Sequence, residues 1–189
     1  MTKSGKEWLR RHVADPYVKK AKAQGYRSRA AFKLLEIDKK EKLLSAGTRV
    51  LDLGAAPGGW SQVAAQKKAK VVAVDLLRMD AIPGVTVLQG DFQQQAFDEA
   101  FDVVLCDVSP NLSGIRGVDQ ARALELSLAA IDLCTKVLKP EGAFLVKAFH
   151  GESFDELLRA LRKAFREVKV IKPAASRDES RENYLLARR

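Results

Sequence analysis

From residue 48 onward, short apolar runs alternate with longer amphipathic runs, and this alternation restricts the chain to few folds. The strand-like runs cover 49–54, 70–77, 86–92, 101–110 and 142–151. The helix-like runs cover 58–68, 118–138 and 153–165. Strands that alternate with helices are typical of a doubly wound α/β sheet, in which mostly parallel strands carry helices on both faces. We therefore expect an α/β fold of this kind.

The pattern changes on both sides of this region. Residues 167–173 and 182–189 read as two short strands joined by a polar link, which predicts an antiparallel hairpin at the C-terminal edge of the sheet. Before the sheet, a helix is expected from residue 29 to about residue 42, with Ser28 as its N-cap. The turn KPEG at 139–142 is expected to close the long helix.

The length and composition of the chain predict a single domain. Its 189 residues, 47% of them hydrophobic, suffice for one well-cored domain over 1–189, with a basic helical extension at 1–45 and an α/β core at 46–189. No segment has the length of a signal-peptide core or a membrane span, so we expect a cytoplasmic protein without membrane contact. The pattern leaves no obvious exposed apolar helix unpaired, so a monomer is expected. Cys106 and Cys134 lack metal-binding spacing, which predicts buried reduced thiols and no metal site.

Positive charge is concentrated at the two ends of the chain. The net charge is +9, but residues 1–45 hold 13 Lys and Arg against 5 Asp and Glu, and residues 159–189 hold 10 against 4. Residues 46–158 are acidic, with 10 against 15. Segregated charge of this kind favours a polyanionic partner, such as RNA, that contacts both ends. Two solvated charged surfaces are the alternative.

Each predicted strand brings a charged residue to its carboxyl end. These residues are Asp52, Asp75, Asp91, Asp107 and Lys147. In open α/β sheets ligands bind beyond the carboxyl ends of the strands, so this edge is the predicted binding site. Lys147 interrupts an otherwise apolar run, where an ammonium group must reach solvent or meet a carboxylate. A structural ion pair is the simplest explanation of a lone lysine, and a catalytic role is the other.

The turn DLGAAPGGW at 52–60 is rich in glycine, which lets a ligand approach the backbone closely. It matches neither the dinucleotide fingerprint GxGxxG nor the phosphate loop GxxxxGK[ST], so a pyrophosphate or triphosphate is not favoured. Asp75 follows Gly54 by 21 residues, the spacing at which such folds bind a ribose diol. Asp91 is expected to accept from an adenine amino group, and Trp60 to pack near the turn. A nucleoside with a positive sulfonium and no phosphate fits, which predicts S-adenosylmethionine as the cofactor.

Seven segments carry a resemblance over almost the whole chain. In order they are RSRAAFKLLEI, DLGAAPGGWSQ, VDLL, GDF, CDVSPNLSG, FLVKAFHGE and SRENY. Over residues 7–187 the chain resembles the FtsJ family (RrmJ, RlmE) of ribosomal RNA 2′-O-methyltransferases. The resemblance implies a Rossmann-like fold that binds S-adenosylmethionine through the turn from Gly54 and through Gly58, Trp60, Asp75, Asp91 and Asp107. It also implies a catalytic set of Lys33, Asp107, Lys147 and Glu182.

Methyl transfer from a sulfonium requires that the acceptor hydroxyl be held in line and lose its proton. Lys147 is the expected base if burial and the charge of Lys33 disfavour its ammonium form. If Asp107 and Glu182 outweigh them, Lys147 stays protonated and orients the hydroxyl, while Asp107 accepts or relays the proton. The base role is preferred, because the strand desolvates the amine and a second lysine is close, and the orienting role is the alternative.

The expected substrate is RNA rather than DNA, because only RNA carries a 2′-hydroxyl. Lys33 and Arg29 stand four apart on the expected first helix and are predicted to contact phosphates beside the target ribose. By resemblance, the acceptor is a uridine of large-subunit (23S) ribosomal RNA. A 2′-O-methyltransferase of transfer RNA or of a cap would retain the same residues, and a non-catalytic RNA-binding ribosome assembly factor is the third reading.

Two features depart from the family pattern. The link from Asp91 to Asp107 is short, so the helix between these strands is expected to shrink to a turn. His150 stands where the family usually has glutamine, and a surface or capping role is expected for it.

Overall fold

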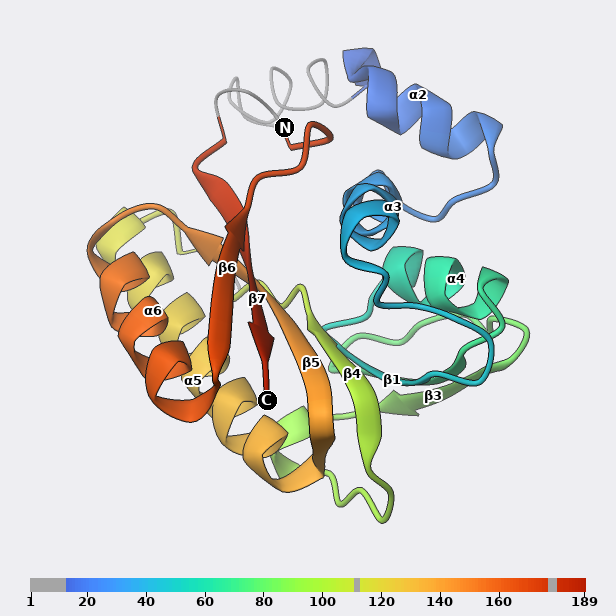
Figure 1. Ribbon diagram of the computed structural model, residues 1–189. Helices are drawn as coiled ribbons and strands as arrows, with labels where there is room; N and C mark the ends of the chain where they lie inside the picture. The colour runs from blue at the N-terminus through green and yellow to red at the C-terminus, as the bar shows by residue number, and fades with distance from the viewer. Residues whose placement is uncertain (1–12, 111–112, 177–179) are drawn as a thin grey trace.

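The computed structural model describes residues 13–110, 113–176 and 180–189, which form a seven-stranded sheet (Figure 1). The strands are β1 (Arg49–Leu53), β2 (Lys70–Asp75), β3 (Val85–Gln89), β4 (Phe101–Cys106), β5 (Leu138–Phe149), β6 (Glu167–Ile171) and β7 (Glu182–Arg188). Their order across the sheet is β3-β2-β1-β4-β5-β7-β6. Strands β1 to β5 pair in parallel, whereas β7 is antiparallel to both β5 and β6. The predicted sheet with an antiparallel edge hairpin is confirmed.

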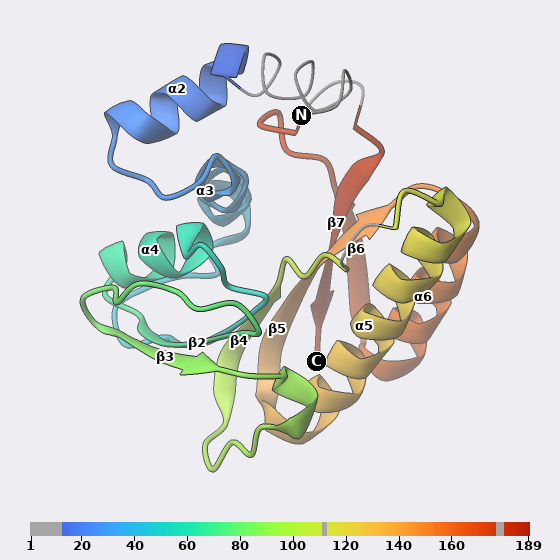
Figure 2. The ribbon, with the colours of Figure 1, turned by 180° about the vertical axis from the view of Figure 1, so that it is seen from behind.

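Helices cover both faces of the sheet. They are α2 (Pro16–Ala23), α3 (Ala30–Glu41), α4 (Gly59–Gln66), α5 (Arg116–Val137) and α6 (Glu152–Ala164). Helices α3 and α4 lie on one face and α5 and α6 on the other, while α2 lies beyond α3, farther from the sheet (Figures 1 and 2). Residues 1–12 of the basic extension lie outside the described residues, and α2 and α3 form most of the remainder.

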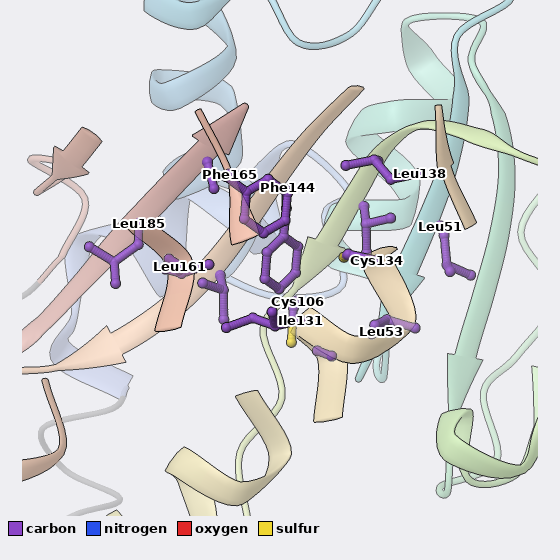
Figure 3. Close-up of a cluster of buried hydrophobic side chains, with 14 of the residues drawn as sticks. Leu51, Leu53, Cys106, Ile131, Cys134, Leu138, Phe144, Leu161, Phe165 and Leu185 are labelled. Atoms are coloured by element: carbon purple, nitrogen blue, oxygen red, sulfur yellow. The ribbon is translucent and has the colours of Figure 1, made fainter. Parts of the chain in front are cut away.

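Two apolar clusters attach these helices to the sheet, because alternate residues of a strand point to opposite faces. Phe144 of β5 belongs to the cluster under α5 and α6, which includes Leu161 (Figure 3). Leu145, the next residue, belongs to the cluster under α3 and α4, which includes Leu34. Lys147 lies two residues beyond Leu145, so its side chain leaves the strand on the side of α3.

Two local predictions were wrong. The N-cap residue of α3 is Arg29, which makes no side-chain cap bond, so Ser28 does not cap the helix. The turn KPEG does not separate helix from strand, because β5 begins at Leu138, directly after α5. Leu138 is buried and pairs with Phe101 of β4, and this burial extends the strand backward. The short link before β4 contains the 3-10 helix Phe92–Gln94, in agreement with the predicted loss of a full helix.

Both cysteines lie in the core of the protein. Cys106 and Cys134 are both buried and free, as predicted. Burial raises the pKa of Cys106 to about 12, so its thiol stays protonated and unreactive. Within the described ranges, no helix combines the length and the apolar character needed to cross a membrane.

Candidate active site

Lys147 and Asp107 form the centre of the candidate active site. Asp107 follows β4, and Lys147 lies near the end of the neighbouring parallel strand β5, so both reach the same edge of the sheet. Lys147 Nζ lies 3.1 Å from Asp107 Oδ1. It also donates to the Asp107 carbonyl oxygen at 2.8 Å and to Ser109 Oγ at 2.6 Å. Three oxygens thus match the three N–H donors of an ammonium group that is almost fully buried.

A second ion pair lies beside the first. Lys33 of α3 donates to Glu182 Oε1 of β7 at 2.5 Å. Lys33 is buried, and the same carboxylate oxygen accepts from Ser176 Oγ at 3.3 Å. Buried charges are stable only when they are paired in this way, so the packing of α3 against β7 depends on both partners.

Tyr184 joins the two ion pairs. Its hydroxyl oxygen lies 3.2 Å from Asp107 Oδ1 and 3.2 Å from Glu182 Oε1. Burial raises the pKa of Tyr184 well above its usual value, so the hydroxyl is neutral and donates its one proton to one carboxylate at a time. A continuous network therefore runs from Lys33 to Lys147 and contains all four residues of the predicted catalytic set.

Three residues bonded to this set, Tyr184, Ser109 and Ser176, are absent from the prediction. Tyr184 lies two residues after Glu182 on β7, and residues two apart on a strand share a face. The segment SRENY therefore already carried the signal for Tyr184. Ser109 lies in the loop after β4, where no such periodicity applies, so only the tertiary fold brings it to Lys147.

A pocket of about 150 Å³ lies beside Asp107, against the glycine-rich turn. The described residues around it include Asp52, Gly54 and Trp60. Gly54 has a φ of +70°, and a Cβ atom there would lie 2.5 Å from Val108 Cγ1. Only glycine fits this close approach, so the turn and the segment that carries Asp107 hold each other in place.

Asp52 lines this pocket and is completely buried. Its Oδ2 atom accepts from Ser61 Oγ at 2.6 Å, whereas Oδ1 has no hydrogen-bond partner among the described residues. Burial raises the pKa of Asp52 to about 7, against the lowering effect of the Ser61 hydrogen bond. A carboxyl group with an unused oxygen suits a ligand that is cationic or donates a hydrogen bond.

Asp75 and Asp91 lie at the carboxyl side of β2 and β3, as predicted, and their carboxylates bind the backbone. Asp75 accepts from the Ala56 N–H at 2.9 Å and from the Leu77 N–H at 2.8 Å. Asp91 accepts from the Gln93 N–H at 2.9 Å and caps the 3-10 helix. Asp75 thereby fixes the glycine-rich turn, and each carboxylate has further lone pairs for a ligand.

Gly58 and Trp60 hold the glycine-rich turn against the rest of the protein. Gly58 has a φ of +107°, and a Cβ atom there would lie 2.6 Å from Ile82 Cδ1. Trp60 is buried, its Nε1 donates to the Ala30 carbonyl oxygen at 2.8 Å, and its ring lies 5.5 Å from that of Tyr184. Trp60 therefore ties α4 to α3 while it also lines the pocket.

The pocket suits a cationic ligand without phosphate groups. Its described lining includes the carboxyl groups of Asp52 and Asp107 and no lysine or arginine. A phosphate group would lie beside two carboxyl groups, with no lysine or arginine in this lining to bind it. The residues present therefore fit S-adenosylmethionine, whose sulfonium and ammonium groups are positive.

Comparison with known proteins assigns the chain to a family. The model of the family described as FtsJ-like methyltransferase matches residues 26–189. This chain belongs to that family. It is 48% identical to the "Ribosomal RNA large subunit methyltransferase E" of Pseudomonas aeruginosa, over 99% of this chain and 96% of the relative. It is 50% identical to the protein of the same name from Nitrosospira multiformis, over 98% and 96%.

A solved structure supports the same assignment at the level of the fold. A candidate ribosomal RNA methyltransferase from Plasmodium falciparum superimposes with a TM-score of 0.75 at 28% identity, over 86% of this chain and 97% of that chain. The Rossmann-like methyltransferase fold predicted from the motifs is thus confirmed, and the chain is an enzyme of the methyltransferase class.

Arg29 and Lys33, which were predicted to contact phosphates, are instead paired with groups of this methyltransferase itself. Arg29 forms an ion pair with Asp15 at 3.2 Å and donates to the Ala175 carbonyl oxygen, and Lys33 is held by Glu182. A phosphate clamp of Arg29 and Lys33 is therefore not formed, because the segment before β7 covers this part of α3. The exposed cations of the described residues near this region include Lys19, Lys20, Lys22, Lys39, Lys40 and Arg181.

Proposed function

We propose that this enzyme transfers a methyl group from S-adenosylmethionine to a ribose 2′-hydroxyl of RNA, on a uridine of large-subunit ribosomal RNA. The observation that carries the proposal is the buried pair of Lys147 and Asp107 beside an acidic pocket without cations. The relatives at 48% and 50% identity are named as methyltransferases of the large-subunit ribosomal RNA, which supports the substrate class. Exposed lysines on α2 and α3 supply the positive surface that an RNA partner requires.

The cofactor would occupy the pocket at the glycine-rich turn. In S-adenosylmethionine the methyl group is bonded to a positive sulfur, and this sulfur needs no further activation as the leaving group. Gly54 and Gly58 keep the turn open to it, and Asp52 offers its unused oxygen to a positive or donating group. Asp75 and Asp91 stand at the adjacent strand ends, where a nucleoside continues along the sheet edge.

Lys147 positions the acceptor hydroxyl. Its Nζ already binds a hydroxyl, that of Ser109, and the ribose hydroxyl would take the same kind of contact. Asp107 holds Nζ in place, and Tyr184 holds Asp107 from the other side. The network thereby fixes the amine at one point without requiring any movement of the strands.

The contacts of Lys147 bear on which group accepts the proton. Nζ contacts one carboxylate, one carbonyl and one hydroxyl oxygen, and this set of contacts supports an amine that orients the acceptor hydroxyl. The pH dependence of single-turnover transfer by Lys147→Arg decides between this orienting role and the base role. A guanidinium group cannot be deprotonated in this range, so an active arginine variant would exclude Lys147 as the base and assign the proton to Asp107.

A methyl-transfer assay with radiolabelled S-adenosylmethionine tests the function itself. The acceptors are large ribosomal subunits, free ribosomal RNA and transfer RNA, and nuclease mapping locates the 2′-O-methyl group. We expect label on a uridine of the large-subunit RNA. Label on transfer RNA alone would favour the related 2′-O-methyltransferase, and the absence of label on every RNA would favour a non-catalytic assembly factor.

A further inference from the structure

The side chain of Arg27, in the link between α2 and α3, binds the backbone of two other segments. It is half-buried. Its Nη1 atom donates to the carbonyl oxygen of Pro57 at 3.2 Å and to that of Asp80 at 2.7 Å, and Nη2 donates to the Ala81 carbonyl oxygen at 2.6 Å. A guanidinium group presents its donors as a rigid planar fork, so one side chain fixes three carbonyl groups relative to one another.

The two segments that Arg27 joins both border the place proposed for the cofactor. Pro57 belongs to the glycine-rich turn and lines the pocket of about 150 Å³. Asp80 and Ala81 belong to the loop 76–84 between β2 and β3, which begins directly after Asp75. Ser28, the residue after Arg27, also lines the pocket. Arg27 thus connects two walls of the cofactor site from behind.

Asp75 joins the same turn and the same loop with the opposite charge. Its carboxylate accepts from the Ala56 N–H in the turn at 2.9 Å and from the Leu77 N–H in the loop at 2.8 Å. Arg27 binds Pro57, the next residue of the turn, and the far part of the loop. An anion that binds N–H groups and a cation that binds carbonyl groups therefore attach the loop to the turn at two points.

Residues 78–81 depend on Arg27 for their position. They form no regular secondary structure, and Arg78, Asp80 and Ala81 are exposed. Within the part of the chain that the structure describes, the hydrogen bonds that join these four residues to another segment all come from Arg27. A segment with so few buried contacts opens easily, so its closed position requires this side chain.

Gly58 shows how closely the loop and Arg27 approach the glycine-rich turn. Besides its contact with Ile82, a Cβ atom at position 58 would lie 3.0 Å from Met79 Sδ and 3.2 Å from Arg27 Nη1. The missing side chain leaves the space that the loop and the guanidinium group occupy. The turn, the loop and Arg27 therefore pack as one unit beside the pocket.

We propose that Arg27 is a positioning residue for the cofactor, which holds the loop 78–81 against the glycine-rich turn and so gives the pocket the shape that S-adenosylmethionine requires. The inference rests on the proposed function, because it concerns the cofactor of the same reaction. Arg27 contacts the walls of the cofactor site and not the Lys147 network, so its loss should weaken cofactor binding and leave the transfer step intact. Its charge then serves backbone carbonyl groups rather than an RNA phosphate.

Limited proteolysis of the full chain without ligand tests the contact itself. Arg78 is exposed within the loop, so trypsin cleavage after it, followed by mass spectrometry, reports how often the loop opens. We expect Arg27→Ala to raise the rate of this cleavage roughly tenfold, because the loop then lacks its tether. Arg159→Ala, which removes an exposed arginine of α6, is the matched control. An unchanged rate of cleavage after Arg78 in Arg27→Ala would overturn the inference.

Isothermal titration with S-adenosylhomocysteine tests the effect on the cofactor site without turnover. We expect Arg27→Ala to raise Kd roughly tenfold, the effect of losing about one hydrogen bond of a charged group. At saturating S-adenosylmethionine, methyl transfer should stay within about twofold of the parental rate, a division between KM and kcat that a general loss of structure does not produce. Arg27→Lys keeps the charge but not the planar fork, and should restore part of the affinity.

The outcomes separate this inference from the proposed function. If Arg27→Ala binds S-adenosylhomocysteine as tightly as Arg159→Ala, the inference is wrong and the function stands. If Arg27→Ala loses affinity for ribosomal RNA and keeps its affinity for S-adenosylhomocysteine, Arg27 binds phosphate and the inference is also wrong. If the parent binds no S-adenosylhomocysteine, the proposed function itself fails. Melting temperatures identify unfolded variants, and Arg27→Lys takes the place of Arg27→Ala if the latter is unfolded.

Discussion

Asp52 lies in β1, and Asp107 directly follows the neighbouring parallel strand β4. The two line one pocket and have opposite environments. Asp52 of β1 pairs in register with Leu105 of β4, two residues before Asp107. Asp52 is completely buried, has a hydroxyl as its hydrogen-bond partner and has its pKa raised to about 7 by burial. Asp107 is partly exposed and has Lys147 Nζ at 3.1 Å.

The comparison shows that the partner, rather than the residue type or its place on the strand, sets the charge of a carboxyl group. Asp107 has the ammonium group of Lys147 as its partner, whereas burial without a cation disfavours ionisation of Asp52. The two groups thereby have different tasks in one pocket. Asp107 holds the amine of Lys147, and Asp52, whose pKa burial raises to about 7, presents an oxygen without a hydrogen-bond partner among the described residues.

Removal of Lys147, the cation that pairs with Asp107, should have the largest effect on the rate of methyl transfer. Lys147→Ala leaves Asp107 as uncompensated as Asp52 and removes the contact to the acceptor hydroxyl. We expect single-turnover methyl transfer to fall by about 10²–10⁴-fold, the usual contribution of a group that handles the proton or positions the hydroxyl. Isothermal titration should give an unchanged affinity for S-adenosylmethionine. A rate within tenfold of the parent would contradict a catalytic role for Lys147.

Replacement of the buried carboxyl group of Asp52 should change how the free energy of unfolding depends on pH. The folded pKa of Asp52, about 7, exceeds the model-peptide value of 3.8, so between these values the folded state holds a proton that the unfolded state has lost. The free energy of unfolding contributed by Asp52 is thus fully present below pH 3.8 and is lost as the pH rises toward 7, by up to about 4 kcal/mol. Asp52→Asn should remove this slope and be the more stable protein at pH 8.

Urea titrations at several pH values measure this difference. Asp132→Asn is the matched control, because Asp132 is exposed and pairs with Lys136 on the surface of α5. An Asp52→Asn variant with the same pH slope as the parent would show that Asp52 is ionised at all these pH values in the folded protein.

Removal of the Tyr184 hydroxyl, which links the two ion pairs, should have an intermediate effect. Tyr184→Phe keeps the ring against Trp60 and removes the hydroxyl that joins Asp107 to Glu182. We expect a loss of about 1 kcal/mol in unfolding free energy, and turnover should fall by roughly tenfold because Asp107 is less firmly held. Tyr26→Phe, which removes an exposed hydroxyl bonded to Gln66, is the control and should leave the rate unchanged.

An exposed ion pair should have the smallest effect. Lys136→Ala breaks the pair with Asp132 on α5, in which both side chains are mostly exposed. The free energy of unfolding should fall by less than about 0.5 kcal/mol, because solvent already screens the pair. Turnover should stay at the parental rate. A larger loss would show that the surface of α5 contributes more than its solvation suggests.

The fold was predictable to a large degree because strand and helix periodicity are local properties. The runs at 49–54 and 101–110 became β1 and β4, and the C-terminal runs became the hairpin of β6 and β7. The errors fell at element ends, at Ser28 and Leu138, where a cap or a buried pairing decides the boundary. Local pattern does not contain that information.

The candidate site was predictable in its members and less so in their contacts. Lys33 and Glu182 are 149 residues apart in sequence, and only the packing of α3 over β7 pairs them. Arg29 pairs with Asp15, the N-cap residue of α2, and no helix spacing could indicate this contact. Ser109 owes its place at Lys147 to the path of a loop.

The sequence by itself determined that charged residues gather at one edge of a parallel sheet, because strand order and direction follow from the alternation of strands and helices. The tertiary structure alone decided which charges neutralise each other. Burial and distance set the energy of a carboxyl group, and both depend on contacts between distant segments. Asp107 thus meets Lys147 and Tyr184, while Asp52, one strand away, meets a serine.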